Sequence, residues 1–424
     1  MEVVVDQVDY AFHPDAGTRA MSHALITGPQ DLLVLGADPI DPERRVLPTV
    51  AGNTAFAFDL YHAVRQGHDN VFFSPYSISA ALALAFAGAR GITEGQMTEV
   101  LHFHLPQGTF HRSFAGIMRA VEYAARPGPP WEQAPQVELG MANALWGQVG
   151  HPFEESFLST LEDAYGAPLH QADFTTQPEQ ARQEINRWVA DKTHGKIQEM
   201  LGVGGVSPAT RLLLTNAIHF LAGWARPFNS ELTVDAPFHR LDGSTVEVPM
   251  MTQCESLPYE QQDGVQVIEL PYWGRTLSMV IILPEAGAFE EFESQFTAGQ
   301  YAQLIASLAQ REVRLYLPRF KLDHKLSLAR TLEEMGMPEA FDPLTADFSG
   351  MDGTGSLFID QVIHQAVVEV DEEGTEAAAA TVVGVPAAMV VSPVTFRADR
   401  PFIFFIRDNT TQTLLFMGRV MDPS

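Results

Sequence analysis

The order of predicted elements along this chain indicates an α+β fold. Helical signals come early: capping residues, a proline at a first helical position, and apolar residues spaced three and four apart. Strand signals follow, as continuous apolar runs and as alternation of apolar with polar residues. No internal repeat, low-complexity tract or Pro/Ser-rich linker follows residue 50. Helices and strands that are segregated along one uninterrupted chain predict a single domain over residues 50–424.

The first part of the chain lacks sustained periodicity. Short apolar patches in residues 1–49 are broken by Pro, Gly and acidic residues, and we interpret this segment as an N-terminal extension of unknown role. The pattern changes at Asn53, a residue type that commonly caps helices. The apolar face of the helix it would start consists of Phe56, Leu60, Ala63 and Val64. Ordered structure is therefore expected to begin at Asn53.

A buried helix is predicted directly after Ser74. Ser74-Pro75 places a capping hydroxyl before a proline at the first helical position, and the apolar run from Ile78 to Ala87 stops at Gly88. Because this helix is apolar almost all round, both of its faces should be buried.

A second capping signal follows 19 residues after Ser74. Thr93 and Gln96 have the spacing of a capping box, which predicts a helix through Met97, Val100 and Leu101.

The remaining elements are predicted mostly as strands. The strand segments are Val137 to Trp146, Leu277 to Leu283 before Pro284, and Val313, Leu315 and Leu317 alternating with Arg314 and Tyr316. Helical patterns lie around Ala181 to Lys192 and Leu326 to Met335. The C-terminus predicts a hairpin, with Phe402 to Ile406 and Thr413 to Met417 joined by the polar turn Asp408-Asn409-Thr410-Thr411.

Composition restricts the partners. A formal net charge of −27 with 26 Lys plus Arg leaves no basic tract to neutralise phosphates or an acidic polysaccharide, so we expect neither nucleic acid nor a heparin-like partner. The start of the chain carries neither a signal peptide nor a membrane span, and no membrane partner is expected. This favours a cytoplasmic location and leaves an extracellular one open if a leader was removed. The single cysteine, Cys254, excludes an internal disulfide and is interpreted as a small buried hydrophobe in a strand.

A search for chemistry carried by this chain finds none. The motifs G-x-S-x-G, H-E-x-x-H, G-x-x-x-x-G-K-[ST] and G-x-G-x-x-G are all missing from the sequence. His102 and His104 could ligate a metal only with a third ligand nearby, and the sequence offers no obvious one. We therefore expect no enzyme activity, no catalytic residue, no metal and no cofactor.

The most informative segment runs from Glu372 to Thr381. Its alanines favour a short helix, and its composition also suits a flexible linker. As a strand, however, it would present one face made only of small or β-branched residues. That face consists of Thr375, Ala377, Ala379, Thr381, Val383, Val385 and Ala387. Such a face could slide between two existing strands, with Glu376 on the solvated side.

This segment resembles the hinge of the reactive-centre loop of the serpins, and the resemblance extends from about Asn53 to Pro423. Similar motifs occur in the same order along the chain. They are Asn70-Val71-Phe72-Phe73-Ser74-Pro75-Tyr76-Ser77-Ile78-Ser79, Gly88-Ala89-Arg90-Gly91, Leu214-Thr215-Asn216-Ala217-Ile218-His219-Phe220, Gly223-Trp224, Leu317-Pro318-Arg319-Phe320, Ala346-Asp347-Phe348-Ser349-Gly350-Met351 and Phe396-Arg397-Ala398-Asp399-Arg400-Pro401-Phe402.

The resemblance implies three β-sheets, eight or nine helices and an exposed loop above the central sheet. The implied hinge is Glu372, Glu373, Gly374, Thr375, Glu376, Ala377, Ala378, Ala379 and Ala380. Counted from this hinge, the bond that a protease attacks is Ala388-Met389, and a shorter variant of the loop would move it by a residue or two. The small apolar residues before that bond suit elastase-like or subtilisin-like pockets, whereas a trypsin-like pocket would require Arg or Lys.

The resemblance also implies a suicide-substrate mechanism. After cleavage the loop would insert into the central sheet and carry the covalently attached protease across the molecule, which distorts the oxyanion hole of the protease. The 15 residues from Gly374 to Ala388 span about 50 Å as a strand, close to the ~55 Å diameter of a domain of this size. Pro386 would cost one ladder hydrogen bond, so insertion should stop at or before it.

Family resemblance assigns two groups of residues to the opening of the sheet. Ser74, Ser77, Asn216 and His364 would form a polar shutter under the central strands, and Trp224 with the Arg319 and Glu372 pair would guard the point where the loop enters. Simpler interpretations stay open: Ser74 as a plain helix cap, His364 as a core histidine, and Arg319 with Glu372 as a surface pair contributing less than ~1 kcal/mol.

Two functions remain. Some serpins are carriers, storage proteins or chaperones, and their hinges usually place a bulky or charged residue on the inserting face. Thr375 and the alanines offer no such block. We therefore predict a monomeric inhibitor whose partner is a serine protease held in a covalent complex, with a non-inhibitory serpin as the alternative.

Overall fold

Two hydrogen-bonded sheets and ten α-helices make up the part of the chain that the structure describes. This computed structural model describes residues 42–126, 137–167, 169–375 and 392–424, with side chains from residue 48 onward. Most helices come in the first half of the chain and most strands in the second, and the strands pair mostly antiparallel, so the predicted α+β class is confirmed. The helices are α1 (Pro42–Val64), α2 (Pro75–Phe86), α3 (Gly91–Val100), α4 (Gln107–Ala124), α5 (Glu155–Tyr165), α6 (Pro178–Lys192), α7 (Phe289–Gln295), α8 (Ala298–Ser307), α9 (Ala329–Met335) and α10 (Ser349–Asp352).

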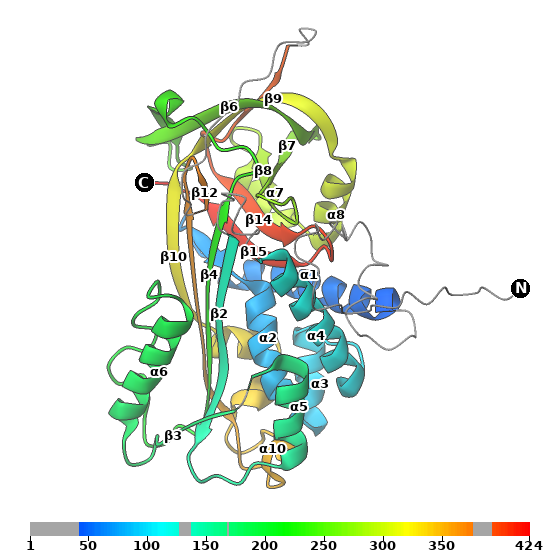
Figure 1. Cartoon of the computed structure of the whole chain (residues 1–424), viewed down its shortest axis with the longest axis vertical. Helices are drawn as coiled ribbons and strands as arrows, with labels where there is room; N and C mark the ends of the chain where they lie inside the picture. The colour runs from blue at the N-terminus through cyan, green and yellow to red at the C-terminus, as the bar shows by residue number, and fades with distance from the viewer. Residues whose placement is uncertain (1–41, 127–136, 168, 376–391) are drawn as a thin grey trace, which may run out of the picture.

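The six-stranded sheet forms the long axis of the molecule (Figure 1). Its strands, in spatial order, are β10 (Phe320–Ser327), β11 (Ile359–Val370), β12 (Gly374–Thr375), β4 (Leu212–Gly223), β2 (Val137–Gln148) and β3 (His170–Ala172). Strands β11 and β4 also pair directly with each other, in parallel, below the short strand β12. Nearly every residue of β4 is buried, because side chains from both of its faces enter hydrophobic clusters.

The nine-stranded sheet forms the upper half of the molecule. Its path is β1 (Val71–Phe73), β15 (Leu414–Val420), β14 (Phe402–Asp408), β8 (Leu277–Pro284), β7 (Val265–Pro271), β6 (Thr245–Gln262), β9 (Ala309–Pro318) and β13 (Val394–Arg397), with β5 (Val234–His239) beside β6. The 18-residue strand β6 pairs with β7 at one end and with β5 and β9 over the rest. This long strand joins two of the three expected sheets into one continuous path.

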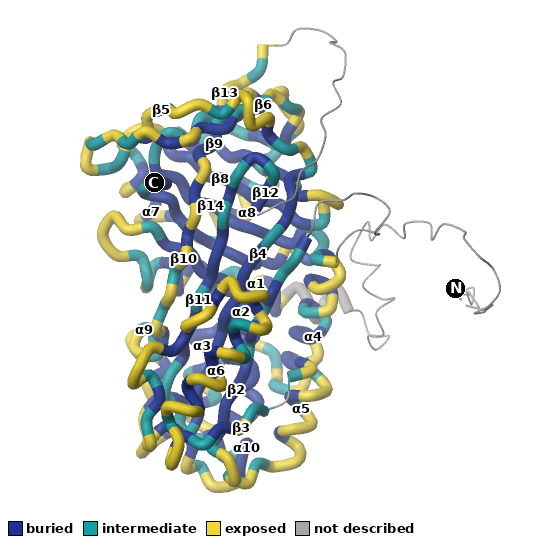
Figure 2. Tube along the Cα trace, turned by 60° about the vertical axis from the view of Figure 1, so that its left-hand side comes forward, coloured by how far each residue is buried: buried dark blue, intermediate teal, exposed yellow. Residues whose placement is uncertain are grey.

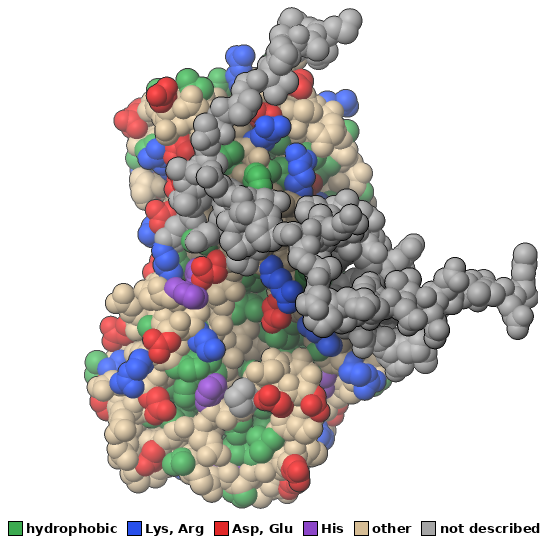
Figure 3. All heavy atoms as spheres, viewed as in Figure 1, with side chains coloured by type: hydrophobic (Ala, Val, Ile, Leu, Met, Phe, Trp, Pro, Cys, Tyr) green, Lys and Arg blue, Asp and Glu red, His purple; other side chains and the backbone are tan. Residues whose placement is uncertain are grey.

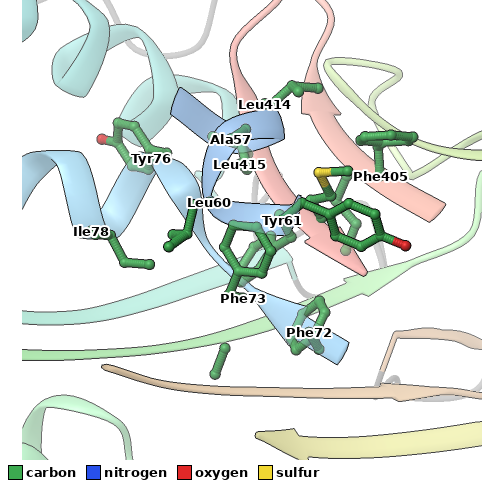
Figure 4. Close-up of a cluster of buried hydrophobic side chains, with 14 of the residues drawn as sticks. Ala57, Leu60, Tyr61, Phe72, Phe73, Tyr76, Ile78, Phe405, Leu414 and Leu415 are labelled. Carbon is green, nitrogen blue, oxygen red and sulfur yellow. The ribbon is translucent and has the colours of Figure 1, made fainter. Parts of the chain in front are cut away.

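Helix α2 lies inside the molecule between the two sheets. All of its residues are buried, and the side chain of Ser74 accepts a hydrogen bond from the Ser77 amide, 3.0 Å away, so the predicted cap and the predicted burial are confirmed. The surrounding cluster of aliphatic and aromatic side chains comes from α1, β1, α2 and the C-terminal hairpin (Figure 4). Burial is concentrated along the central strands (Figure 2), whereas α6 covers the other face of the six-stranded sheet over a smaller apolar cluster.

The predicted strands and the C-terminal hairpin are confirmed, whereas two helix starts were wrong. Helix α1 begins at Pro42, and Asn53 lies inside it, where its amide donates to the Leu414 carbonyl 3.1 Å away. In α3 the predicted capping box does not form. The Thr93 hydroxyl accepts a hydrogen bond from the backbone amide of Asp347, and the Gln96 side-chain Oε1 accepts one from the backbone amide of Glu339. Both polar side chains serve distant segments instead of their own helix.

Two smaller expectations also need correction. Cys254 lies in a strand, as predicted, but its side chain is exposed, because it is opposite the exposed Arg314 on the outer face of the β6 and β9 pair. The segment from Leu326 first completes β10, so the helix predicted there begins only at Ala329.

Candidate functional site

The parallel pairing of β11 with β4 is the feature around which the candidate site is built. It runs from Ile359 opposite Leu212 to Val367 opposite His219, and we call this pairing the seam. At the upper end of the seam, Gly374 and Thr375 pair with β4 and Thr375 also pairs with Val370 of β11, antiparallel in both cases. The two residues of β12 therefore already occupy a position between the two strands.

The turn before β12 is fixed by Trp224, which follows β4. The Trp224 amide donates to the Glu373 carbonyl at 2.8 Å, and its indole N–H donates to the Asp371 carbonyl at 2.9 Å. Its ring stacks on Tyr272, with centroids 4.7 Å apart, and the Tyr272 hydroxyl lies 2.9 Å from the fully buried Thr375 hydroxyl. Trp224 and Tyr272 thus hold Asp371, Glu373 and Thr375 at the upper end of the seam.

In the pair of Arg319 and Glu372 the carboxylate is buried, whereas the Arg319 side chain is 44% exposed. The Glu372 side chain is 7% exposed and accepts from Arg319 Nε at 3.0 Å, while Thr233 also donates to it. Burial raises the pKa of the Glu372 carboxyl, but the hydrogen bonds from Arg319 and Thr233 outweigh burial and hold the pKa below its ordinary value. Glu372 is therefore ionised and anchored at neutral pH.

The four predicted shutter residues come together under the middle of the seam. The Ser74 amide donates to His364 Nε2 at 3.1 Å, and the Ser74 hydroxyl donates to the Leu415 carbonyl at 2.6 Å. The Asn216 amide donates to the Ser77 hydroxyl and carbonyl at 2.6 and 2.7 Å, and His364 Nδ1 is bonded to the Asn216 carbonyl oxygen. The group links α2 to β4 and β11 across the seam.

His364 is a neutral imidazole in this network. Because Nε2 accepts from the Ser74 amide, the ring proton sits on Nδ1, from which it donates to Asn216. Burial, and behind it the nearby His324, lowers the pKa of His364 to about 3.

Acidification is expected to weaken the folded state through His364. Between pH 6.5, the ordinary histidine pKa, and about pH 3, the unfolded chain takes up a proton that the native chain does not. The free energy of unfolding therefore decreases as the pH is lowered through this window. The loss from this group between pH 7 and pH 5 is about 2 kcal/mol. Melting curves recorded at pH 7 and pH 5 measure this loss of stability. The control is the variant His364→Gln, whose side chain keeps one donor and one acceptor but cannot titrate. An equal pH effect in both proteins would contradict the assignment.

Sequence reasoning missed three members of the site. Asn143 of β2 accepts from the Ser77 hydroxyl at 2.9 Å and also from Asn216, Tyr272 stacks on Trp224, and Thr233 bonds Glu372. Asn143 had a detectable signal, a polar amide within a strand that otherwise reads as buried. Tyr272 and Thr233 had none, because both reach the site from other segments.

Part of the predicted site lies outside the described residues. This applies to Glu376, to Ala377, Ala378, Ala379 and Ala380, and to the Ala388-Met389 bond.

Other candidate features take ordinary places. His102 pairs with Asp59 at 2.7 Å, and no group of three or more His, Cys, Asp or Glu residues within the described ranges could hold a metal ion. None of the helices described has the length and apolarity needed to cross a membrane. On the face shown in Figure 3, basic and acidic side chains are interspersed, without a continuous basic area.

Comparisons with known proteins agree with this architecture. A family model described as Serpin (serine protease inhibitor) matches residues 51–423. A leukocyte elastase inhibitor of Equus caballus is 40% identical over 88% of this chain and 98% of its own length. An uncharacterised serpin-like protein of Thermococcus kodakarensis is 41% identical over 90% of this chain and 87% of its own.

A solved structure gives the same result at the level of the fold. Uncleaved ovalbumin superposes with a TM-score of 0.79 at 30% identity, over 88% of this chain and 99% of that one. Serpins are protease inhibitors rather than catalytic enzymes. This chain, with its α+β serpin fold, belongs to the serpin family.

Proposed function

We propose that this protein is a suicide-substrate inhibitor of serine endopeptidases with elastase-like or subtilisin-like specificity. It acts by cleavage of the loop, formation of an acyl-enzyme and insertion of the loop as a new strand along the seam. The observation that carries the proposal is strand β12, which already pairs with both β11 and β4 at the upper end of the seam. In this proposal the inhibitor is a monomer whose single domain is residues 50–424, preceded by an N-terminal extension of unknown role, residues 1–49.

The register of β12 supports insertion because it is the same on both sides. Val370 and Ala222 both lie opposite Thr375, and the seam below keeps these two strands in step down to His364 opposite Asn216. An antiparallel strand continuing from Thr375 would therefore match hydrogen-bonding positions on both neighbours without a shift. The seam would have to separate, but every backbone bond lost between β11 and β4 would be replaced by bonds to the new strand.

The small face of the loop also fits the site that would receive it. In the continued register, Ala377, Ala379 and Val383 fall at positions where the residues of both neighbouring strands are buried in the core. Those neighbours are Val368, Ala366 and Val362 on β11 and Phe220, Ile218 and Leu214 on β4. Larger side chains would overpack this layer, whereas alanine and valine add little volume.

Thr381 would arrive at the shutter. The continued register places it between His364 and Asn216, whose side chains now bond directly to each other across the seam. Insertion would separate these two strands and break that bond. A threonine hydroxyl can both donate and accept, so it can satisfy the two groups that lose each other. This match between one residue of the loop and the buried polar pair supports insertion to at least residue 381.

Specificity is proposed from the residues before the expected cleavage site. Val385, Ala387 and Ala388 are small and apolar, and Ala388 suits the shallow pockets of elastase-like and subtilisin-like enzymes. The relative named leukocyte elastase inhibitor points the same way.

The direct test is a reaction with pancreatic elastase, with trypsin as the matched comparison. We expect a covalent complex with elastase that survives boiling in denaturant. Mass spectrometry should show that the released C-terminal fragment begins at Met389. Trypsin should give no comparable complex. Quantitative cleavage by elastase without any complex would contradict inhibition and favour a non-inhibitory serpin.

A further inference from the structure

A cleft of about 470 Å³ lies between α4 and α5, away from the seam and the shutter. Three arginines line it: Arg90 before α3, and Arg112 and Arg119 on α4. In the described part of the chain, none of the three forms an ion pair with a carboxylate. In a protein with a formal net charge of −27, three uncompensated guanidiniums around one cleft reverse the local charge.

Arg90 is held in place before any ligand arrives. Its Nη1 donates to the Ala89 and Ala87 carbonyls at 2.6 and 3.1 Å and to Gln107 Oε1 at 3.2 Å. The guanidinium rests on Gly350, where a Cβ atom would come within 2.4 Å of the Arg90 Cζ atom. A guanidinium fixed in this way loses little entropy when its remaining N–H groups bind an anion.

A buried histidine in the wall of the same cleft has one nitrogen without a partner. His111 is 4% exposed, its Nδ1 lies 2.6 Å from the Tyr165 hydroxyl, and its Nε2 has no hydrogen-bond partner. Burial raises the pKa of Tyr165, so the phenol keeps its proton. If the Tyr165 hydroxyl donates to Nδ1, only the Nε2 proton is left without a partner. If Nδ1 donates to Tyr165 instead, both the phenol proton and Nε2 are left without one, which costs more. The ring proton is therefore on Nε2, as an unsatisfied buried donor.

We propose that this cleft binds a small dianionic oxyanion, either free phosphate or the phosphate group of a phosphomonoester. Guanidiniums bind phosphate oxygens in pairs. Ser156 and Thr160 of α5 also line the cleft, and the Thr160 hydroxyl donates to the Ser156 carbonyl at 2.9 Å, which leaves Ser156 as the hydroxyl donor for the anion. The single carboxylate in the lining, Asp163, accepts from Ser159 of its own helix at 3.0 Å and leaves the cleft with a net positive charge.

The surroundings favour a small anion over a long one. Glu155 and Glu162 are exposed on α5, each next in sequence to a residue that lines the cleft, so a polysulfated or polyphosphate chain that extended along α5 would meet like charges. The volume of the cleft accommodates a phosphate group with a small substituent.

Isothermal titration calorimetry with inorganic phosphate and with glycerol 2-phosphate tests the proposal, at an ionic strength held constant with sodium chloride. We expect saturable binding of at least one of them, and the stronger of the two identifies the source of the phosphate group. Arg112→Gln combined with Arg119→Gln should weaken binding at least tenfold, since each removes a charge-assisted contact. Both residues are exposed, so this variant should fold normally, and its inhibition of elastase should be unchanged.

The control variant combines Arg187→Gln with Arg330→Gln, which removes the same charge from α6 and α9. Its affinity for phosphate should equal that of the unmodified protein. Equal weakening in the two double variants would show a general charge effect and overturn the site. Binding of a heparin chain without binding of either small phosphate, or no binding at all, would overturn it as well.

Discussion

Replacing Thr375 with arginine is expected to abolish covalent trapping of elastase while leaving the loop cleavable. Thr375 is fully buried at the mouth of the seam, where its hydroxyl contacts Tyr272. A charged side chain there would be buried without a partner, at a cost of several kcal/mol, on the order of the buried-charge penalties seen in other proteins. In the intact protein the two-residue strand β12 can leave the seam and place the arginine in water, whereas an inserting loop cannot avoid this cost. Every 1.4 kcal/mol added to the barrier slows insertion about tenfold.

Trapping requires that the loop inserts faster than water hydrolyses the acyl-enzyme. When insertion is slower, hydrolysis occurs first and releases an active protease. Thr375→Arg should therefore raise the number of inhibitor molecules consumed per elastase more than about tenfold, measured by titration of residual activity. The matched control is Glu376→Arg, the next residue along the chain, which strand alternation places on the solvated face. That variant should trap elastase nearly as well as the unmodified protein, and equal loss in both variants would contradict insertion.

Local signals predicted the parts of the fold that depend on neighbouring residues. The Ser74-Pro75 cap, the run from Leu277 and the C-terminal hairpin are confirmed because caps, continuous apolar runs and polar turns act over a few positions. Asn53 failed for the opposite reason, since its amide serves the Leu414 carbonyl on a strand far away in sequence. A capping residue in a sequence predicts a possible cap, and tertiary contacts decide whether the side chain is used elsewhere.

The candidate site shows the same division. Ser74, Ser77, Asn216 and His364 were named from family motifs, and the structure brings them into one network. Asn143 completes that network from β2, where its signal was a polar amide within a strand that otherwise reads as buried. The seam itself could not be predicted, because a parallel pairing between β11 and β4 is fixed by topology and leaves no local trace in either strand.

Cleavage of the loop is expected to raise the melting temperature of this protein by more than about 10 °C. The seam joins β11 and β4 over eight residue pairs, and an inserted strand would replace this single ladder with two. The gain is on the order of ten backbone hydrogen bonds at ~1 kcal/mol each, together with burial of the small face of the loop. For a domain of this length, ~10 kcal/mol corresponds to a shift of more than about 10 °C.

The measurement compares differential scanning calorimetry of the intact protein with that of the protein nicked by thermolysin, a zinc protease that forms no acyl-enzyme to be trapped, after removal of the protease. Nicked Thr375→Arg supplies the control, because its loop is cut but cannot insert, and it should melt close to the intact protein. If the nicked unmodified protein melts no higher than the intact one, the seam stores no free energy that cleavage can release. A protease tethered to such a loop would hydrolyse its ester and leave, since nothing would drive the strand into the sheet.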